Sequence, residues 1–284
     1  MPRGLIVCRA RGNEQRFGNV SRETNKGLGL AASSLFHVKP DRFSCQLPLL
    51  IAHCPLPITH RPSPSRYTLG VDSPALAANA VTWARHSLAA DQLETLEAYA
   101  EWLVHEAIPA GGLGPREADR VWGRHIADSL AFAVAWKAAP SEILDVGTGV
   151  GLPGIPLAIL WPGTEVTVLD RGGRRIRLLT RAVRILGLEN VRVTQGDVFD
   201  VADEWSGVVF RGSVKASEAV GLAGRLLGVP GVAVLGLSRR QEPPDRTRDL
   251  LGVAQALGME AELVGTPPEI LDGPAWILIM RLGV

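Results

Sequence analysis

The chain has 284 residues, of which 46% are hydrophobic and 21% charged, and its formal net charge is +1. This composition is typical of a globular protein with one substantial core and a smaller unit beside it. No apolar run approaches the ~20 residues of a membrane-spanning helix, and the basic N-terminus lacks the apolar centre of a secretory signal, so we expect a soluble, cytoplasmic protein without a membrane partner.

Cysteine occurs only near the N-terminus, at Cys8, Cys45 and Cys54. An odd number of cysteines argues against a disulfide framework, and their spacing is not that of metal ligands. We therefore predict neither disulfides nor a metal site.

Residues 1–72 carry ten Lys/Arg against four Asp/Glu, many prolines and no helical period. This composition predicts a disordered basic extension. Within it, NVSRET (19–24) and LFHVK (35–39) are what the palindrome TTTCACGTGAAA, the core of a bacterial chromosome-partition site, encodes in two reading frames when it is extended by its flanking bases. Two interpretations stay open: intergenic DNA read from a start codon placed too far upstream, or chance matches in a basic tail.

Residues 73–139 have the apolar spacing of helices. Leu93, Leu96, Tyr99 and Leu103 recur at three- and four-residue intervals, and a second amphipathic stretch over 117–136 follows a loop rich in glycine and proline. Such spacing gives each helix a stripe to bury. We predict a small helical domain over 73–139.

From residue 140 to 284, strand-like runs alternate with helical patterns. The runs cover 142–146, 165–170, 191–197, 207–212, 231–237, 259–265 and 275–282. Strands separated by helices predict an α/β fold with a doubly wound parallel sheet. The last two runs are expected to form an antiparallel pair at one edge.

The stretch ILDVGTGVGLPGIPLAIL (143–160) places a glycine-rich turn where the first strand leads into its helix. Ligands bind such sheets outside the carboxyl ends of the strands. Residues 149–154 satisfy G-x-G-x-x-G, which is a weak signal alone. A dinucleotide's pyrophosphate needs free N–H donors and a positive field, whereas Asp145 adds negative charge here and Pro153 removes a donor.

S-adenosylmethionine suits this turn better, because it carries an ammonium and a sulfonium and no phosphate. Asp145 can favour those cations, and Asp170, which ends the second strand, can accept hydrogen bonds from both ribose hydroxyls. Gly147, Gly149 and Gly151 let the backbone approach the ligand closely. An NAD-dependent Rossmann oxidoreductase and a non-catalytic cofactor-binding protein stay open as alternatives.

The absence of two catalytic features from the sequence limits which methyl acceptors are possible. Carbon-5 methylation of a pyrimidine usually needs a cysteine nucleophile, and none follows Cys54. The run VVFRGSVKA (208–216) lacks the Asn/Asp-Pro-Pro-aromatic pattern that is common for exocyclic amines. A ring nitrogen such as guanine N7 offers a free lone pair and needs no general base, so alignment can carry much of the catalysis and we assign no catalytic residue.

Three segments resemble one known family: RHIADSL (124–130), DVGTGVGLPGIPLAI (145–159) and VLDRGGRRIRLLTRAVRILGLENVRV (168–193). They are similar to the bacterial 16S ribosomal RNA guanine-N7 methyltransferases, also called glucose-inhibited division protein B. The resemblance implies a class I S-adenosylmethionine-dependent methyltransferase domain over 140–284, a small N-terminal helical domain, and a guanine in the 530 loop of 16S RNA as acceptor. The substrate is expected to be free RNA or the small ribosomal subunit, and the enzyme a monomer.

The resemblance also places the cofactor contacts by position. They fall on Gly147 and Leu152 in the loop, on Val198 and Phe199 after the third strand, and on Arg211 after the fourth. Asp170 corresponds to the family's acid at the end of the second strand.

The chain departs from the family's pattern at several positions. Phe199 stands where an acid is usual, and Asp197 and Asp200 on either side are alternative adenine contacts. RGS (211–213) replaces R-A, and Ser238 replaces a lysine for which Arg239 is a candidate substitute. PAGGLGP (109–115) replaces N-L-T.

Affinity for RNA has to come from local charge, because the net charge is only +1. Arginines recur at helical spacing at Arg171, Arg174, Arg177, Arg181 and Arg184, opposite an apolar face. We predict phosphate contacts for Arg174, Arg177 and Arg181, with a solvated helix face as the alternative.

The resemblance further places Arg124 and His125 near the cofactor cleft, where we expect contacts with RNA. For His125, a role as a core or capping histidine stays open.

Overall fold

The computed structural model describes residues 73–237, 243–244, 247–271 and 273–283. The predictions for residues 1–72 and for Ser238 and Arg239 lie outside these described residues. Within them, none of the helices combines the length and apolar character needed to cross a membrane.

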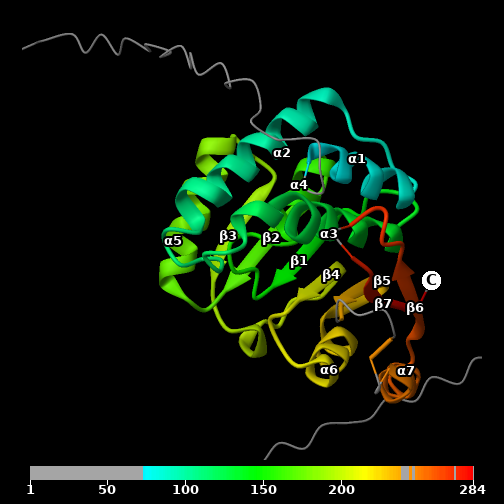
Figure 1. Cartoon of the computed structure of the whole chain (residues 1–284). Helices are drawn as coiled ribbons and strands as arrows, with labels where there is room; N and C mark the ends of the chain where they lie inside the picture. Colours follow the sequence, from blue (N-terminus) through cyan, green and yellow to red (C-terminus); the bar gives the residue numbers. More distant parts are fainter. Residues whose placement is uncertain (1–72, 238–242, 245–246, 272, 284) are drawn as a thin grey trace, which may run out of the picture. The chain divides into compact units, whose positions relative to one another are not determined.

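The described residues contain one mixed sheet of seven strands in the order β3-β2-β1-β4-β5-β7-β6 (Figure 1). The strands are β1 (Glu142–Val146), β2 (Glu165–Asp170), β3 (Val191–Gln195), β4 (Trp205–Arg211), β5 (Leu227–Gly236), β6 (Glu260–Thr266) and β7 (Ala275–Leu282). The first five run parallel, and β7 is antiparallel to both β5 and β6. The predicted doubly wound sheet and its antiparallel pair are therefore confirmed, with β7 inserted between β5 and the edge strand β6.

Each central strand sends alternate side chains to opposite faces of the sheet, as the pleat requires. In β1, Ile143 packs into one hydrophobic core and Leu144 into the other. In β5, Val234 and Leu235 divide in the same way. Both faces are covered, which explains why these strands are nearly continuous apolar runs in the sequence.

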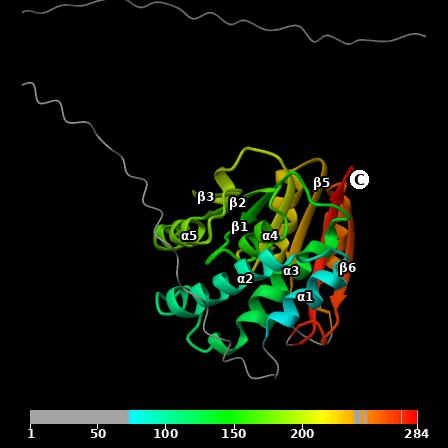
Figure 2. The same ribbon diagram turned by 90° about the horizontal axis from the view of Figure 1, so that it is seen from above.

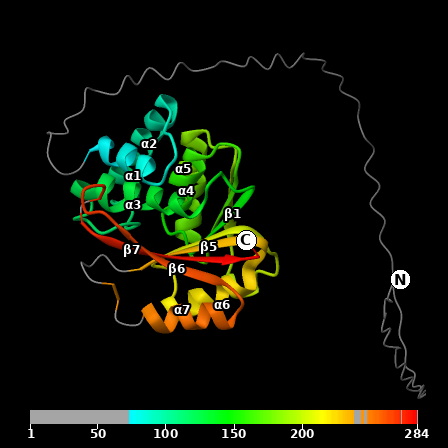
Figure 3. The same cartoon turned by 90° about the vertical axis from the view of Figure 1, so that its right-hand side faces the viewer.

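Helices cover both faces of the sheet (Figure 3). One face carries α6 (Ala216–Leu226) and α7 (Thr247–Ala256), and the other carries α4 (Gly154–Leu160) and α5 (Gly173–Leu186). The helix α5 ends at Gly187, which adopts a left-handed conformation with φ 65°. Glycine is the usual residue in this position, because it has no Cβ to clash with the preceding turn.

The segment before the sheet forms a further helical layer over α4 and α5 (Figure 2). It comprises α1 (Pro74–Trp83), α2 (Ala90–Trp102), a π-helical turn (Leu103–Ala107), a 3-10 turn (Ala118–Arg120), a second π segment (Val121–Ile126), α3 (Ala127–Leu130) and a 3-10 helix (Ala131–Ala135). Its buried residues share one core with the sheet. A domain boundary at residues 139–140 therefore stays a prediction.

The strand order reverses direction between β1 and β4. The chain passes from β1 through α4 to β2 on one side, and β4 lies on the other side of β1. The loops that leave the carboxyl ends of β1 and β4 diverge at this point, which is where open α/β sheets bind ligands.

Candidate functional site

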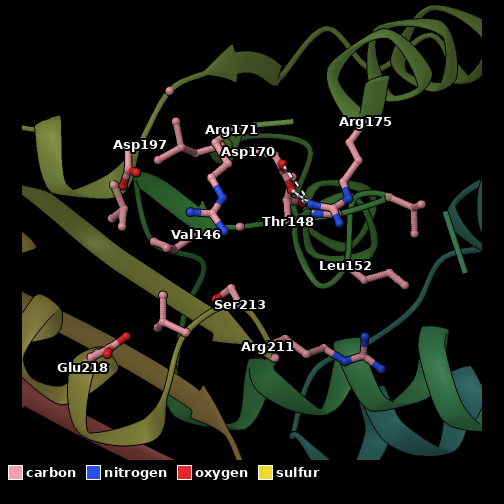
Figure 4. Close-up of a pocket in the computed structure, with 18 of the residues that line it drawn as sticks. Val146, Thr148, Leu152, Asp170, Arg171, Arg175, Asp197, Arg211, Ser213 and Glu218 are labelled. Atoms are coloured by element: carbon pink, nitrogen blue, oxygen red, sulfur yellow. Dashed lines mark hydrogen bonds and ion pairs between the residues drawn. The ribbon is translucent and has the colours of Figure 1, made fainter. Parts of the chain in front are cut away.

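A pocket of about 830 Å³ opens at the carboxyl ends of β1 to β4 (Figure 4). Its volume lies within the range of small-molecule and cofactor sites. The four strand-end loops supply most of its lining, at Val146–Val150 and Leu152, Leu169–Arg171, Gly196–Phe199 and Arg211–Lys215. Arg175, Glu218, Gly112 and Leu113 complete it.

The loop after β1 can approach the loop after β4 only because it contains glycine. Gly147 has φ 66°, and a Cβ at this position would lie 2.4 Å from the Cβ of Ser213. Any side chain would therefore both strain the backbone and clash. The missing Cβ lets the Ser213 side chain pack directly against the backbone of this loop, and both residues line the pocket.

Asp145 binds both ends of this loop through hydrogen bonds. Its side chain is fully buried, and Oδ2 accepts hydrogen bonds from Thr148 Oγ1 at 2.5 Å and from the Gly154 N–H at 2.8 Å. Burial raises the pKa of the carboxyl to about 7. Asp145 does not line the pocket, so the structure does not place it among the cofactor contacts that we predicted from its sequence position. Its side chain points to the interior side of the loop.

The position of Asp145 also bears on the dinucleotide alternative. The first N–H group of α4 donates to Asp145, and the residue before it is Pro153, which has no N–H. The start of this helix therefore offers little to a phosphate group, in agreement with the sequence argument against NAD.

Tyr99 of α2 fixes the same loop from the helical layer. Its side chain is fully buried, and its hydroxyl donates to the carbonyl oxygen of Val150 at 2.9 Å. Burial raises the pKa of Tyr99 well above its usual value, so the hydroxyl keeps its proton and remains a donor.

Asp170 lies at the end of β2, lines the pocket and is 3% exposed. Its Oδ1 accepts from the Gly172 N–H at 2.7 Å, and its Oδ2 accepts from the Gly149 N–H at 3.1 Å. Arg175 contacts the same carboxylate at 3.3 Å, as Figure 4 shows. These three donors hold the carboxylate in one orientation at the wall of the pocket.

The other predicted cofactor residues meet in this pocket. Gly147, Gly149, Leu152, Val198, Phe199 and Arg211 all line it. Phe199 is 63% exposed at the surface. Of its two acidic neighbours, Asp197 lines the pocket and Asp200 does not, and Asp197 Oδ1 accepts from the Phe199 N–H at 3.1 Å. Asp197 is thus the better placed of the two alternatives.

His125 is a buried residue rather than a surface one. It is 5% exposed, its Nε2 lies 2.9 Å from Glu117 Oε2, and its Nδ1 lies 3.4 Å from Arg211 Nη2. Burial, reinforced by Arg211, lowers its pKa to about 4. Both ring nitrogens of His125 face protein groups, which favours the alternative of a core histidine over the predicted RNA contact. Arg124 is partly exposed and pairs with Glu117 at 3.0 Å.

The arginines of α5 are exposed as the helical spacing predicts, and Arg171 lies just before the helix at the pocket lining. Of the three predicted phosphate contacts, Arg181 differs from Arg174 and Arg177 because it forms a two-point ion pair with Glu106, with Nε 2.6 Å from Oε2. A phosphate would have to replace this carboxylate. The role of Arg174, Arg177 and Arg181 in RNA binding stays a prediction.

Sequence reasoning missed several lining residues. Ser213 and Lys215 follow β4, so the rule that ligands bind at strand ends could have identified them. Gly112 and Leu113 come from the helical layer, where no local motif signals a pocket. Gly112 packs on the loop so closely that a Cβ would lie 2.4 Å from Val150 Cγ1.

Several known proteins are similar to this chain. A protein of Corynebacterium efficiens called ribosomal RNA small subunit methyltransferase G is 31% identical over 233 residues, which is 80% of this chain and 96% of that protein. The protein of the same name from Mycolicibacterium paratuberculosis is 47% identical over 105 residues, which is 37% of this chain and 42% of the relative. Among solved structures, M. jannaschii TYW2 in complex with AdoMet matches with a TM-score of 0.44 and 17% identity, over 58% of this chain and 78% of that one.

The family model described as GidB, rRNA small subunit methyltransferase G, matches residues 92–243. This region is more than half of the chain and contains every lining residue of the pocket named above. The class I methyltransferase fold expected from the sequence is thereby confirmed. The chain belongs to the GidB family of small-subunit ribosomal RNA methyltransferases.

Proposed function

We propose that this protein transfers a methyl group from S-adenosylmethionine to N7 of a guanine in the 530 loop of 16S ribosomal RNA. The observation that carries the proposal is the pocket at the point where the strand order reverses, which is lined by Asp170 and by the glycine loop that follows β1. Membership of the GidB family supports the same reaction.

The residues of the pocket fit S-adenosylmethionine. The backbone of Gly147, which carries no side chain, lines the pocket beside Ser213, whose hydroxyl is buried without a hydrogen-bond partner in the described part of the chain. A buried donor without a partner is costly, which favours a polar ligand at this point. The helix start that a phosphate would need is already bound to Asp145.

Each end of the pocket suits a different part of this ligand. We assign the ribose hydroxyls to Asp170, the adenine to Val198 and Phe199 with Asp197 beside them, and the carboxylate of the methionine part to Arg211. When bound, S-adenosylmethionine supplies an electrophilic methyl group. The protein's own task is to hold the acceptor nitrogen in line with that group and to exclude water.

No general base is required of this chain, because N7 of guanine carries a free lone pair. Gly112 and Leu113 form a wall of the pocket from the helical layer and limit how the base can enter. The exposed Arg174 and Arg177 of α5 lie on the helix that follows the Asp170 loop and are proposed to contact phosphates of the RNA. We further propose that the enzyme is a monomer and acts in the cytoplasm on free 16S RNA or on the small subunit.

The direct test is to map 16S RNA modification in a strain that lacks the gene. We expect mass mapping to show the loss of one methyl group from the 530 loop and its return on complementation with the wild-type gene. Complementation with Asp170→Ala should restore it poorly, and complementation with Asp200→Ala, whose side chain lies outside the pocket lining, should restore it fully. An unchanged 16S RNA in the deletion strain would refute the proposed acceptor.

Calorimetry with S-adenosylmethionine and with NAD separates the proposal from the oxidoreductase alternative. Binding of S-adenosylmethionine alone is the expected outcome. Binding of NAD in its place would support the alternative, and binding of S-adenosylmethionine without transfer to RNA would support a non-catalytic cofactor-binding protein.

A further inference from the structure

The guanidinium of Arg211 is held by a short stretch of the helical layer. Its Nε donates to Asp128 Oδ2 at 2.9 Å, and its Nη2 donates to the carbonyl oxygen of Arg124 at 2.8 Å. Nη2 also lies 3.4 Å from Nδ1 of His125. All three partners lie within residues 124–128, although Arg211 itself belongs to β4. One motif of the helical layer therefore surrounds an arginine of the sheet that lines the pocket.

The tautomer of His125 follows from its two neighbours. The carboxylate of Glu117 accepts hydrogen bonds, so the proton of the neutral ring sits on Nε2, which lies 2.9 Å from Glu117 Oε2. Nδ1 then carries a lone pair and accepts from Arg211. The buried ring has a pKa of about 4, which keeps Nδ1 an acceptor at neutral pH.

The remaining donors of Arg211 can be counted. A guanidinium has five N–H groups, one on Nε and two on each terminal nitrogen. Asp128, Arg124 and His125 engage the group on Nε and the two on Nη2. Within the described part of the chain, Nη1 donates to no partner. It is the nitrogen left to bind an anionic group of a ligand.

We propose that His125 and Asp128 are positioning residues that fix the guanidinium of Arg211 so that Nη1 can bind the carboxylate of the methyl donor. The inference rests on the proposed function, because that carboxylate is the only anionic group of S-adenosylmethionine. A long side chain that is already held loses less rotamer freedom when the ligand binds, so the held arginine binds more tightly. The RHI-x-DSL segment thus acts on the donor through Arg211.

Two ligands test this role. S-adenosylmethionine carries the carboxylate, whereas 5′-methylthioadenosine has the same adenine and ribose but lacks it. We expect Asp128→Asn and His125→Gln to weaken S-adenosylmethionine binding by about tenfold or more, as for other hydrogen bonds to charged groups. Their affinity for 5′-methylthioadenosine should stay at the wild-type value. Arg211→Gln removes the guanidinium itself and should weaken S-adenosylmethionine binding most. The matched control is Asp119→Asn, which changes an exposed acid of the same helical layer.

A second pair of variants tests the tautomer. The amide of His125→Asn reaches the position of Nδ1 and can accept from Arg211, whereas that of His125→Gln reaches the position of Nε2 and keeps only the Glu117 contact. We expect His125→Asn to retain affinity for S-adenosylmethionine better than His125→Gln. Thermal unfolding identifies any variant that does not fold. If the His125 variants do not fold, Asp128→Asn tests the positioning role by itself.

The outcomes are distinguishable. Equal loss of both ligands in folded variants would mean that His125 and Asp128 only maintain the fold, and it would overturn the inference. Unchanged binding of both ligands would overturn it as well. A wild-type protein that binds neither ligand would instead refute the proposed function itself.

Discussion

Buried polar side chains in this protein act mainly on its own backbone and on other side chains. Asp145 holds the glycine loop and the start of α4, and Tyr99 holds the same loop through Val150. A buried polar group must find partners because unpaired groups lose their hydration without compensation. These residues therefore shape the pocket without lining it.

Asp170→Ala tests the residue at the wall of the pocket. We expect this variant to bind S-adenosylmethionine more weakly by about 1–3 kcal/mol, because two ribose hydroxyls would lose a charged acceptor. Calorimetry measures the dissociation constant, and Asp200→Ala is the matched control. Because Asp170 also accepts from the N–H groups of Gly149 and Gly172, thermal unfolding must accompany the measurement. An unchanged dissociation constant would place the ribose elsewhere.

Asp145→Asn tests the effect of a buried carboxyl on stability. The pKa of Asp145 is about 7 in the folded protein against an ordinary value of 3.8. The folded state therefore binds the proton more tightly, so the contribution of Asp145 to stability is full below pH 3.8 and is lost as the pH rises through 7. The amide cannot ionise, so the free energy of unfolding of Asp145→Asn should rise relative to wild type by up to about 1.4 kcal/mol per pH unit across this window.

Because His125 also makes stability depend on pH, the effect of Asp145 has to be measured as the difference between wild type and Asp145→Asn. Its folded pKa of about 4 lies below the ordinary 6.5, so its contribution to stability is full above pH 6.5 and is lost as the pH falls through 4. This trend opposes that of Asp145 in the same range. Denaturant unfolding of both proteins at several pH values cancels the His125 contribution, and a constant difference between them would contradict the prediction.

At the scale of elements, the pattern of α5 predicts its two faces but not its ion pair. Leu179 is buried and the arginines are exposed, as a helical period of apolar residues requires. Glu106 is 75 residues away in the sequence from Arg181, so no local pattern could pair them. The same holds for Gly112 and Leu113, which reach the pocket only through packing of the helical layer.

Replacing Arg174 and Arg177 with Gln tests the basic face of α5. If both hold phosphates, the slope of log affinity against log salt should shrink by about 1.4–1.8 units, since each contact contributes roughly 0.7–0.9. Adding Arg181→Gln should change the slope less, because Arg181 already pairs with Glu106.

The control for the Arg174 and Arg177 double variant is a second double variant that loses the same charge from other parts of the surface. Arg192→Gln combined with Arg248→Gln removes two exposed arginines, one on β3 and one on α7. It should leave the slope nearly unchanged, and S-adenosylmethionine affinity should be unchanged in every variant. A slope that the Arg174 and Arg177 changes do not alter would make this face an ordinary solvated surface.

At the scale of the molecule, every pocket-lining residue in the described part of the chain comes after position 111. The lining runs from Gly112 to Glu218, and the first buried hydrophobic residue of the described ranges is Ala77. We expect a protein that begins at Ser73 to bind S-adenosylmethionine as the full chain does, by calorimetry. A lower affinity in a truncated protein of unchanged melting temperature would assign residues 1–72 a part in the site.

The sequence alone determined the order of strands and helices along the chain, the antiparallel pair at its end, and most of the residues that meet in the pocket. These features depend on local periodicity and on loops that follow strands directly, so their signals lie within a few residues of one another. Only the tertiary structure decided that Asp145 points away from the pocket, that His125 is buried against Arg211, and that Arg181 meets Glu106. The direction of a side chain depends on partners brought together from distant positions in the chain, and no pattern of neighbouring residues contains that information.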